Sequence, residues 1–202
     1  KFLKIFTERF PCREVFNNIG LAYYQIAMKH LSHCDRENAH QYKLATQLDT
    51  ETRAANFVSR VYQGEDQCPE MIQFRENLNE AVRRFRVACE KDASYLPARI
   101  NLSSAYITAG KYSDAMAVLN EALNLKPDDP NTLNNKAVAM YLMGPSIGAD
   151  MFSQSQGILK DLIQNHPNFS DAMYNLGRLY FKQEKKDSAG EIWNQYLNIE
   201  ST

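Results

Sequence analysis

The chain has 202 residues, of which 44% are hydrophobic and 23% are charged, as is typical of a folded globular protein. The net charge is −1 and is evenly spread, with 14 basic and 13 acidic side chains in residues 1–95 and 9 and 11 in residues 96–202. This balance argues against bulk-charge attraction to nucleic acid or to an anionic membrane. No apolar run approaches the roughly 20 residues that a membrane-spanning helix needs.

The two ends of the sequence suggest a piece of a longer protein. Residues 1–10 look like the second helix of a hairpin whose first helix is absent, and the chain starts at Lys1 rather than at Met. The last helix pattern stops near Ile199 without the polar capping helix that helical solenoids normally carry.

The first half of the chain is helical in pattern but irregular. We expect one long helix over residues 13–32 and another over residues 36–61. A loop follows at residues 64–69, where Gly64 and Pro69 interrupt the pattern, and a third helix runs from 70 to 91.

From residue 81 onward the sequence repeats itself. Ala81, Phe85 and Ala88 are followed 34 residues later by Ala115, Leu119 and Ala122. Leu102, Tyr106, Ala115 and Leu119 recur 74 residues later, which is two periods of 34 plus six, as Leu176, Tyr180, Ala189 and Trp193. A single six-residue insertion explains the offset. We place it at residues 144–148, where Gly144 and Pro145 favour a longer loop.

These residues resemble the tetratricopeptide repeat, whose first helix carries a large residue, Leu-Gly and Tyr at fixed spacing and whose second helix carries Ala and Phe. The last copy reads Met173-x-x-Leu176-Gly177-x-x-Tyr180 and then Ala189-x-x-x-Trp193. Other copies begin at Phe16, at Arg99 and, in degenerate form, at Leu133. Small residues recur at the seam, where they let two helices approach closely: Gly20, Ser103, Ala137 and Gly177.

The resemblance implies an all-α fold, a right-handed superhelix of antiparallel helical hairpins. We expect residues 1–202 to form a single solenoid. Residues 1–92 would be its atypical part, with one hairpin start at 13–28, and 96–129, 130–169 and 170–202 would be regular repeats. One hairpin cannot bury its own apolar face, so neighbouring hairpins must stack.

The resemblance also implies a function, because the first helices of this family line a concave groove that binds proteins or peptides. An asparagine precedes the Leu-equivalent residue in each copy: Asn18, Asn101, Asn135 and Asn175. Each amide offers a donor and an acceptor, which suits the backbone of an extended peptide. Further groove residues are expected one residue before this asparagine, or three and six after it: Asn134, Tyr141, Tyr174, Arg178 and Phe181.

A clamp for chaperone tails, which some members of the family form with Lys, Asn and Arg, is not expected here. Asn17, Leu21, Asn131 and Asn135 occupy the places of its side chains. The alternative to peptide recognition by the asparagine row is that asparagine is simply common at this position and hydrogen-bonds locally.

Other chemistry has little support in the sequence. His30, His33, Cys34 and His40 are the only cluster with metal-ligand chemistry, and a helix end explains them more simply. No cofactor motif, nucleophile elbow, phosphate loop or HExxH motif is present. The four cysteines form no CxxC pair and are typical of reduced thiols in a cytoplasmic protein.

We therefore expect a non-enzymatic module that binds a protein or peptide partner. One alternative is a regulatory or substrate-recruiting arm of a larger multidomain enzyme. Another is a scaffold that self-associates through its end hairpins.

Overall fold

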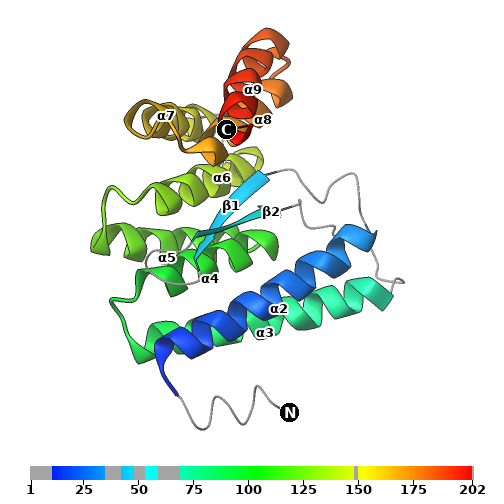
Figure 1. Cartoon of the computed structure of the whole chain (residues 1–202), viewed down its shortest axis with the longest axis vertical. Coiled ribbons are helices and arrows are strands. Elements are labelled where there is room, and N and C mark those ends of the chain that lie inside the picture. Colours follow the sequence, from blue (N-terminus) through cyan, green and yellow to red (C-terminus); the bar gives the residue numbers. More distant parts are fainter. Residues whose placement is uncertain (1–10, 35–41, 48–52, 59–68, 148–149, 202) are drawn as a thin grey trace.

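The computed structural model describes residues 11–34, 42–47, 53–58, 69–147 and 150–201 (Figure 1). In chain order its elements are α2 (Arg13–Cys34), β1 (Tyr42–Gln47), β2 (Arg53–Val58), α3 (Pro69–Lys91), α4 (Leu96–Thr108), α5 (Tyr112–Leu125), α6 (Pro130–Ile147), α7 (Asp150–Asn165), α8 (Ser170–Lys182) and α9 (Lys186–Glu200).

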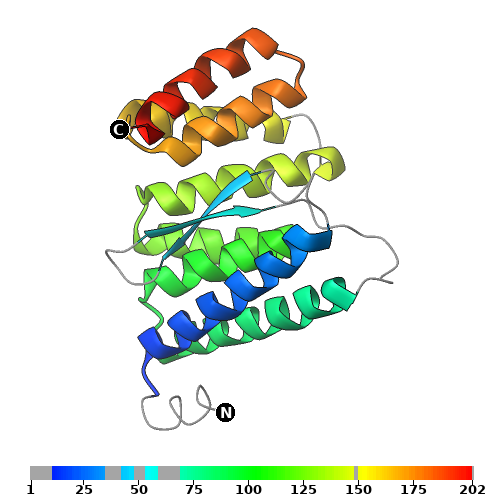
Figure 2. The ribbon, with the colours of Figure 1, turned by 45° about the vertical axis from the view of Figure 1, so that its right-hand side comes forward.

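The helices pack in consecutive pairs, α2 with α3, α4 with α5, α6 with α7, and α8 with α9. Figure 2 shows these hairpins stacked one on the next along the long axis of the molecule. The fold is thus the helical repeat solenoid that the sequence predicted. The last three pairs span residues 96–125, 130–165 and 170–200.

Prolines and a capping carboxylate mark where helices begin. Pro130 is the first residue of α6 and Pro97 lies in the first turn of α4, positions where a missing N–H does least harm. Just before α6, Asp129 Oδ1 accepts hydrogen bonds from the backbone N–H of Thr132 at 2.9 Å and from its hydroxyl at 2.8 Å. This carboxylate caps the helix by satisfying a free donor of its first turn.

The small seam residues stand where helices touch. A Cβ added at Gly20 would lie 2.5 Å from Cε1 of Phe85 on α3, and one at Gly177 would meet the indole of Trp193 on α9. Each glycine therefore permits an aromatic ring of the second helix to pack directly on the backbone of the first. This is the close approach that the sequence pattern predicted.

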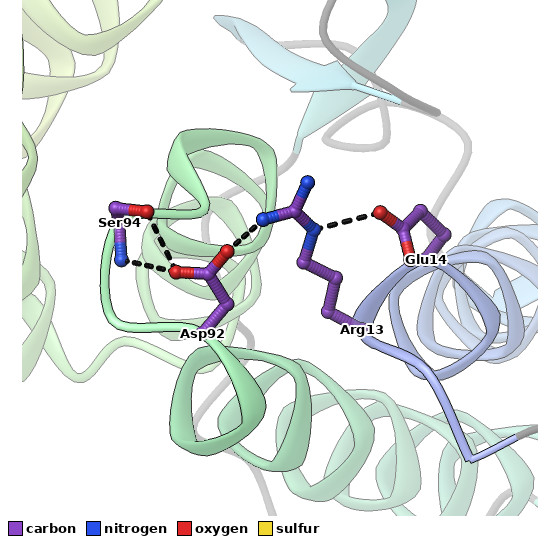
Figure 3. A network of polar contacts seen from close by, with 4 residues as sticks. All are labelled: Arg13, Glu14, Asp92 and Ser94. Atoms are coloured by element: carbon purple, nitrogen blue, oxygen red, sulfur yellow. Dashed lines mark hydrogen bonds and ion pairs between the residues drawn. The ribbon is translucent and has the colours of Figure 1, made fainter.

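The start of α2 is fixed against the turn between α3 and α4 by a polar network (Figure 3). Arg13 forms an ion pair with Asp92, and its Nε donates to Glu14 Oε1 at 2.7 Å. Asp92 Oδ1 in turn accepts from the backbone N–H of Ser94 at 2.7 Å and from its hydroxyl at 2.6 Å. The guanidinium also lies 4.7 Å from the centre of the Tyr95 ring. The hydrogen bond from Arg13 lowers the pKa of the Glu14 carboxyl.

The sequence reading was wrong for residues 36–61, where we expected a helix. The described part of this segment forms an antiparallel two-stranded hairpin, with Ala45 opposite Ala55. Tyr42, Thr46, Phe57 and Val58 favour strands. Contacts between β1 and three helices then outweigh the helical propensity of the Lys, Leu, Ala and Gln residues nearby. By contrast, α2 and α3 lie close to the bounds expected for them.

The insertion at residues 144–148 does not take the expected form of a loop starting at Gly144. Helix α6 continues to Ile147, so that it has 18 residues where α4 has 13. A Cβ at Gly144 would lie 2.9 Å from Cζ of Phe152 on α7, so the glycine allows α7 to pack closely on the lengthened helix. Pro145, in the last turn of α6, lacks the N–H that would otherwise donate to a carbonyl one turn earlier.

The expected helix over residues 1–10 lies outside the described residues. None of the helices that the structure describes is both long and apolar enough to cross a bilayer.

Candidate strand-binding face

Strand β1 lies on one face of the solenoid and contacts α4, α6 and α8, the first helices of three successive hairpins. We call this surface of α4, α6 and α8 the inner face. Figures 1 and 2 show the two strands crossing α4 and α6 obliquely, and β2 pairs with one edge of β1. The side chains of Leu44 and Ala45 in β1 are fully buried. The inner face is therefore covered by an extended segment of the same chain.

The side chain of Asn135 holds both polar backbone groups of Ala45. Its Oδ1 accepts the hydrogen bond of the Ala45 N–H at 2.8 Å, and its Nδ2 donates to the Ala45 carbonyl oxygen at 3.1 Å. The hydroxyl of Ser104 on α4 donates to the same carbonyl at 2.6 Å. Two neighbouring helices thus recognise one residue of an extended strand through its backbone.

The Asn135 amide is held in place by side chains of α4. Its Nδ2 donates to the hydroxyl oxygen of Ser104 at 2.8 Å and lies 3.3 Å from that of Ser103. Asn135, Ser103 and Ser104 are all fully buried, where a hydrogen bond that is not made costs more than at the surface. The amide is therefore oriented by the solenoid itself, ready for a backbone N–H and C=O.

Two further pairs of buried amides lie on either side of Asn135 along the stack. Asn101 Nδ2 on α4 donates to Asn17 Oδ1 on α2 at 2.7 Å, and Asn175 Nδ2 on α8 donates to Asn134 Oδ1 on α6 at 2.9 Å. All four side chains are fully buried. In each pair, the asparagine just before the Leu-equivalent residue reaches back to the preceding repeat.

Of the four asparagines predicted as a row, the structure brings Asn101, Asn135 and Asn175 into this buried array. Asn18 is exposed, and its neighbour Asn17 takes part instead. The reason is geometric, because the amide at this position faces the preceding hairpin and no helix precedes α2 among the described residues. The role of these asparagines toward a partner stays a prediction.

The aromatic residues predicted for the groove pack against the second helices of their own hairpins. Tyr141 makes an edge contact with Phe152 at 5.2 Å between ring centres, Tyr174 does so with Tyr196 at 5.6 Å, and Phe181 lies 5.8 Å from Trp193. Trp193 Nε1 also donates to the Tyr174 carbonyl at 3.2 Å. Phe181 remains 46% exposed. These contacts tie the rings to the second helices of their own hairpins, whereas Asn134 and Asn135 lie at the inner face.

Two residues, Ser104 and Asn17, take part in the site in a way that the sequence analysis did not predict. Ser103 was noted in the sequence as a small seam residue, but nothing in the repeat pattern marked the hydroxyl of Ser104 as a backbone donor. Asn17 could be found only by knowing that these amides pair one repeat back. Arg178 on α8, a predicted groove residue, has its Nε buried with no hydrogen-bond acceptor among the described residues.

The part of the chain that the structure describes contains no group of three or more His, Cys, Asp or Glu side chains that would hold a metal ion. His33 Nδ1 lies 2.7 Å from the backbone carbonyl of Lys29, a local contact near the end of α2. His40 lies outside the described residues, as does the side chain of Cys34.

Two segments match models of the tetratricopeptide repeat, one described as a TPR repeat over residues 103–144 and one as a tetratricopeptide repeat over residues 171–199. A MamA structure from Desulfovibrio magneticus RS-1 is 18% identical, with 62% of this chain and 67% of that chain covered at a TM-score of 0.49. YrrB, described as a TPR protein with an unusual peptide-binding site, is 15% identical, with 64% and 81% covered at a TM-score of 0.28. No curated protein matches the chain by sequence.

The matched segments coincide with helices that the structure pairs into hairpins. Residues 103–144 run from the middle of α4 into α6, and residues 171–199 span α8 and α9. Sequence motif, helix pairing and family models agree that the chain contains tetratricopeptide repeats, matched at residues 103–144 and 171–199, within a helical solenoid, and repeats of this kind serve in protein interaction.

Proposed function

We propose that the chain binds an extended segment of a partner protein on its inner face, and that it recognises this segment mainly through the backbone. The observation that carries the proposal is the double hydrogen bond between the Asn135 amide and the Ala45 backbone. A carboxamide that pairs with both the N–H and the C=O of one residue recognises an extended conformation, because a helix uses those groups internally.

The physical setting of Asn135 supports a recognition role. The amide and the hydroxyl of Ser104 are fully buried, so each hydrogen bond to the segment forms away from competing water. Asn135 is also oriented by Ser103 and Ser104, so little side-chain entropy is lost when a segment binds. Backbone recognition of this kind resembles the addition of a strand to a sheet edge, with affinity from main-chain hydrogen bonds and specificity from alternate side chains.

The proposal is tested by capturing partners from a native lysate and mapping the contact by cross-linking and mass spectrometry. Wild type is compared with Asn135→Ala and with Asn120→Ala, which changes an exposed asparagine of α5. Circular dichroism first establishes that all three chains are equally helical.

We expect partner cross-links on α4, α6 and α8 in wild type and in Asn120→Ala. When residues 36–67 are replaced by a short Gly-Ser linker, so that β1 cannot compete for the inner face, we expect Asn135→Ala to lower the captured partner at least about tenfold, the size expected for two buried hydrogen bonds. Cross-links confined to α5, α7 and α9 would place the binding surface elsewhere. Equal capture by the folded Asn135→Ala chain that carries this linker would also overturn the proposal.

A further inference from the structure

The hairpin that covers the inner face is an insertion within a helical hairpin. Thirty-four residues, 35–68, separate α2 from α3, whereas three residues, 109–111, join α4 to α5, and three, 183–185, join α8 to α9. Helices α2 and α3 pack together extensively without it. The strands are therefore not needed to close the α2–α3 pair, and their position on α4, α6 and α8 calls for another explanation.

Strand β1 sits on the solenoid in the manner of a bound peptide. One edge of β1 pairs with β2, and at its other edge both polar groups of Ala45 bond to side chains of α4 and α6. Directly opposite residues of an antiparallel pair either exchange both hydrogen bonds or exchange none. Because the N–H and C=O of Ala45 point to the helices, Ala45 and Ala55 form a pair that exchanges none.

The buried side chains of β1 define what the face accepts. Leu44 belongs to the main hydrophobic cluster and has no exposed surface. Ala45 is also fully buried at the point where its backbone meets Asn135. A larger side chain at this place would have to displace packed atoms.

We infer that β1 is a resident ligand of the inner face, and that a partner binds by replacing it with an extended strand carrying an aliphatic residue followed by a small one. The inference rests on the proposed function and adds its regulation and the chemistry of the partner. A tethered strand competes at an effective concentration that reaches the millimolar range for short linkers. The apparent affinity for a free strand is then the intrinsic affinity multiplied by the fraction of chains whose inner face is open.

Two alanines of the hairpin provide a matched pair of variants. Ala45→Pro removes the N–H that bonds to Asn135, and Ala55→Pro removes an N–H that, by the same alternation, points away from β1. Both changes place a proline at the same level of the hairpin. Only the first removes a hydrogen bond between the strand and the inner face.

The probe is a fluorescein-labelled synthetic peptide of residues 40–60, and its binding to the full chain is measured by fluorescence anisotropy. We expect Ala45→Pro to bind the peptide at least about tenfold more tightly than wild type or Ala55→Pro, because its own strand no longer holds the face. We expect a peptide with Phe in place of Ala45, or with N-methylalanine there, to bind at least about tenfold more weakly, since each loses packing or a hydrogen bond.

A second variant guards against misfolding of Ala45→Pro. In this variant residues 36–67 are replaced by a short Gly-Ser linker, and its helicity is checked by circular dichroism. If wild type binds the peptide as tightly as the folded released variants, the resident-ligand inference is wrong while the proposed function stands. If no folded released variant binds the peptide, the proposed function fails and the inference fails with it. If the Phe peptide binds as well as the alanine peptide, the rule for the small residue is wrong.

Discussion

Asn175 donates a hydrogen bond to Asn134 across 2.9 Å, and neither side chain has exposed surface. The same relationship joins Asn101 to Asn17 two hairpins away. We predict that Asn175→Ala lowers the free energy of unfolding by about 1–3 kcal/mol, because a buried amide loses a partner when the other is truncated. Asn101→Ala should have a similar effect. Urea denaturation followed by the fluorescence of Trp193, the single tryptophan, measures both changes.

The matched control is Asn18→Ala, which removes an exposed amide next to Asn17. Its free energy of unfolding should stay within about 0.5 kcal/mol of wild type, as surface substitutions usually do. Equal stabilities for Asn175→Ala and Asn18→Ala would mean that the buried amide pair contributes nothing to the stack.

The solenoid was predictable because its signals are local and recur. Leu102, Tyr106 and Ala115 recur 74 residues later, two periods of 34 plus a six-residue insertion, and a small seam residue such as Gly177 is present in each copy. Asn135 could be chosen for the same reason, by its place in the repeat. The position of a residue within the repeat also indicates whether it faces the preceding hairpin, but it does not indicate whether a helix packs against that residue.

The hairpin was not predictable by the same means. Its stability depends on contacts between residues far apart in the chain, such as Ala45 with Asn135, which are 90 residues apart. Local propensity in 36–61 does not contain that information, and the segment has no counterpart in the other repeats. Asn18 lies outside the buried array because no helix packs before α2 among the described residues, and its role toward a partner stays a prediction.

The seam glycines provide a second prediction, on packing. Gly177→Ala should destabilise the chain by about 1–3 kcal/mol, because the new Cβ would meet the Trp193 indole and force the α8–α9 pair apart. Gly190→Ala on α9 is the control, because a Cβ there meets nothing within 4 Å. That change should be neutral, or stabilising by up to about 1 kcal/mol, from helix propensity alone. Thermal unfolding of both variants tests the pair, and a loss of stability in Gly190→Ala would contradict this account.

A third prediction concerns pH and the carboxyl of Glu80 on α3. Arg83 Nε and a second guanidinium nitrogen donate to it at 2.8 Å, and Arg84 Nε does so at 2.7 Å. The hydrogen bonds from Arg83, followed by those from Arg84, lower the pKa of this carboxyl below its usual value. A carboxyl whose pKa is lower in the folded state stabilises the fold above its unfolded pKa, and this contribution is lost as the pH falls through the folded pKa.

Glu80→Gln should therefore lower the free energy of unfolding by about 0.5 kcal/mol near neutral pH, a small value because solvent screens such pairs. The difference from wild type should shrink toward zero as the pH falls below about 4, near the unfolded pKa of glutamate, and should also shrink in high salt. Glu90→Gln changes an exposed carboxylate of the same helix and serves as the control. A Glu80→Gln effect that is constant from neutral to acid pH would show that the charge is not its source.

The last prediction concerns thiol reactivity, which reports on the packing of α3. Burial raises the pKa of the Cys89 thiol to about 11. Only the thiolate reacts with alkylating reagents, and near pH 8 a group with this pKa is ionised in roughly one molecule in a thousand. Cys12 is exposed. Iodoacetamide should therefore modify Cys12 much faster than Cys89 in the folded chain, with peptide mass spectrometry following each site.

The pH dependence of the Cys89 alkylation rate shows whether the reaction is slow because the thiol is rarely ionised or because the reagent cannot reach it. If ionisation limits the reaction, the Cys89 rate should rise about tenfold for each pH unit between about pH 7 and 10, because the thiolate fraction rises by that factor. In denaturant the two cysteines should react at similar rates, since burial is the main cause of the raised pKa. Cys89 could react as fast as Cys12 in the folded chain only if α3 opened far more readily than a helix packed against both α2 and α4 should. The α2–α3 pair would then not be a stable part of the stack.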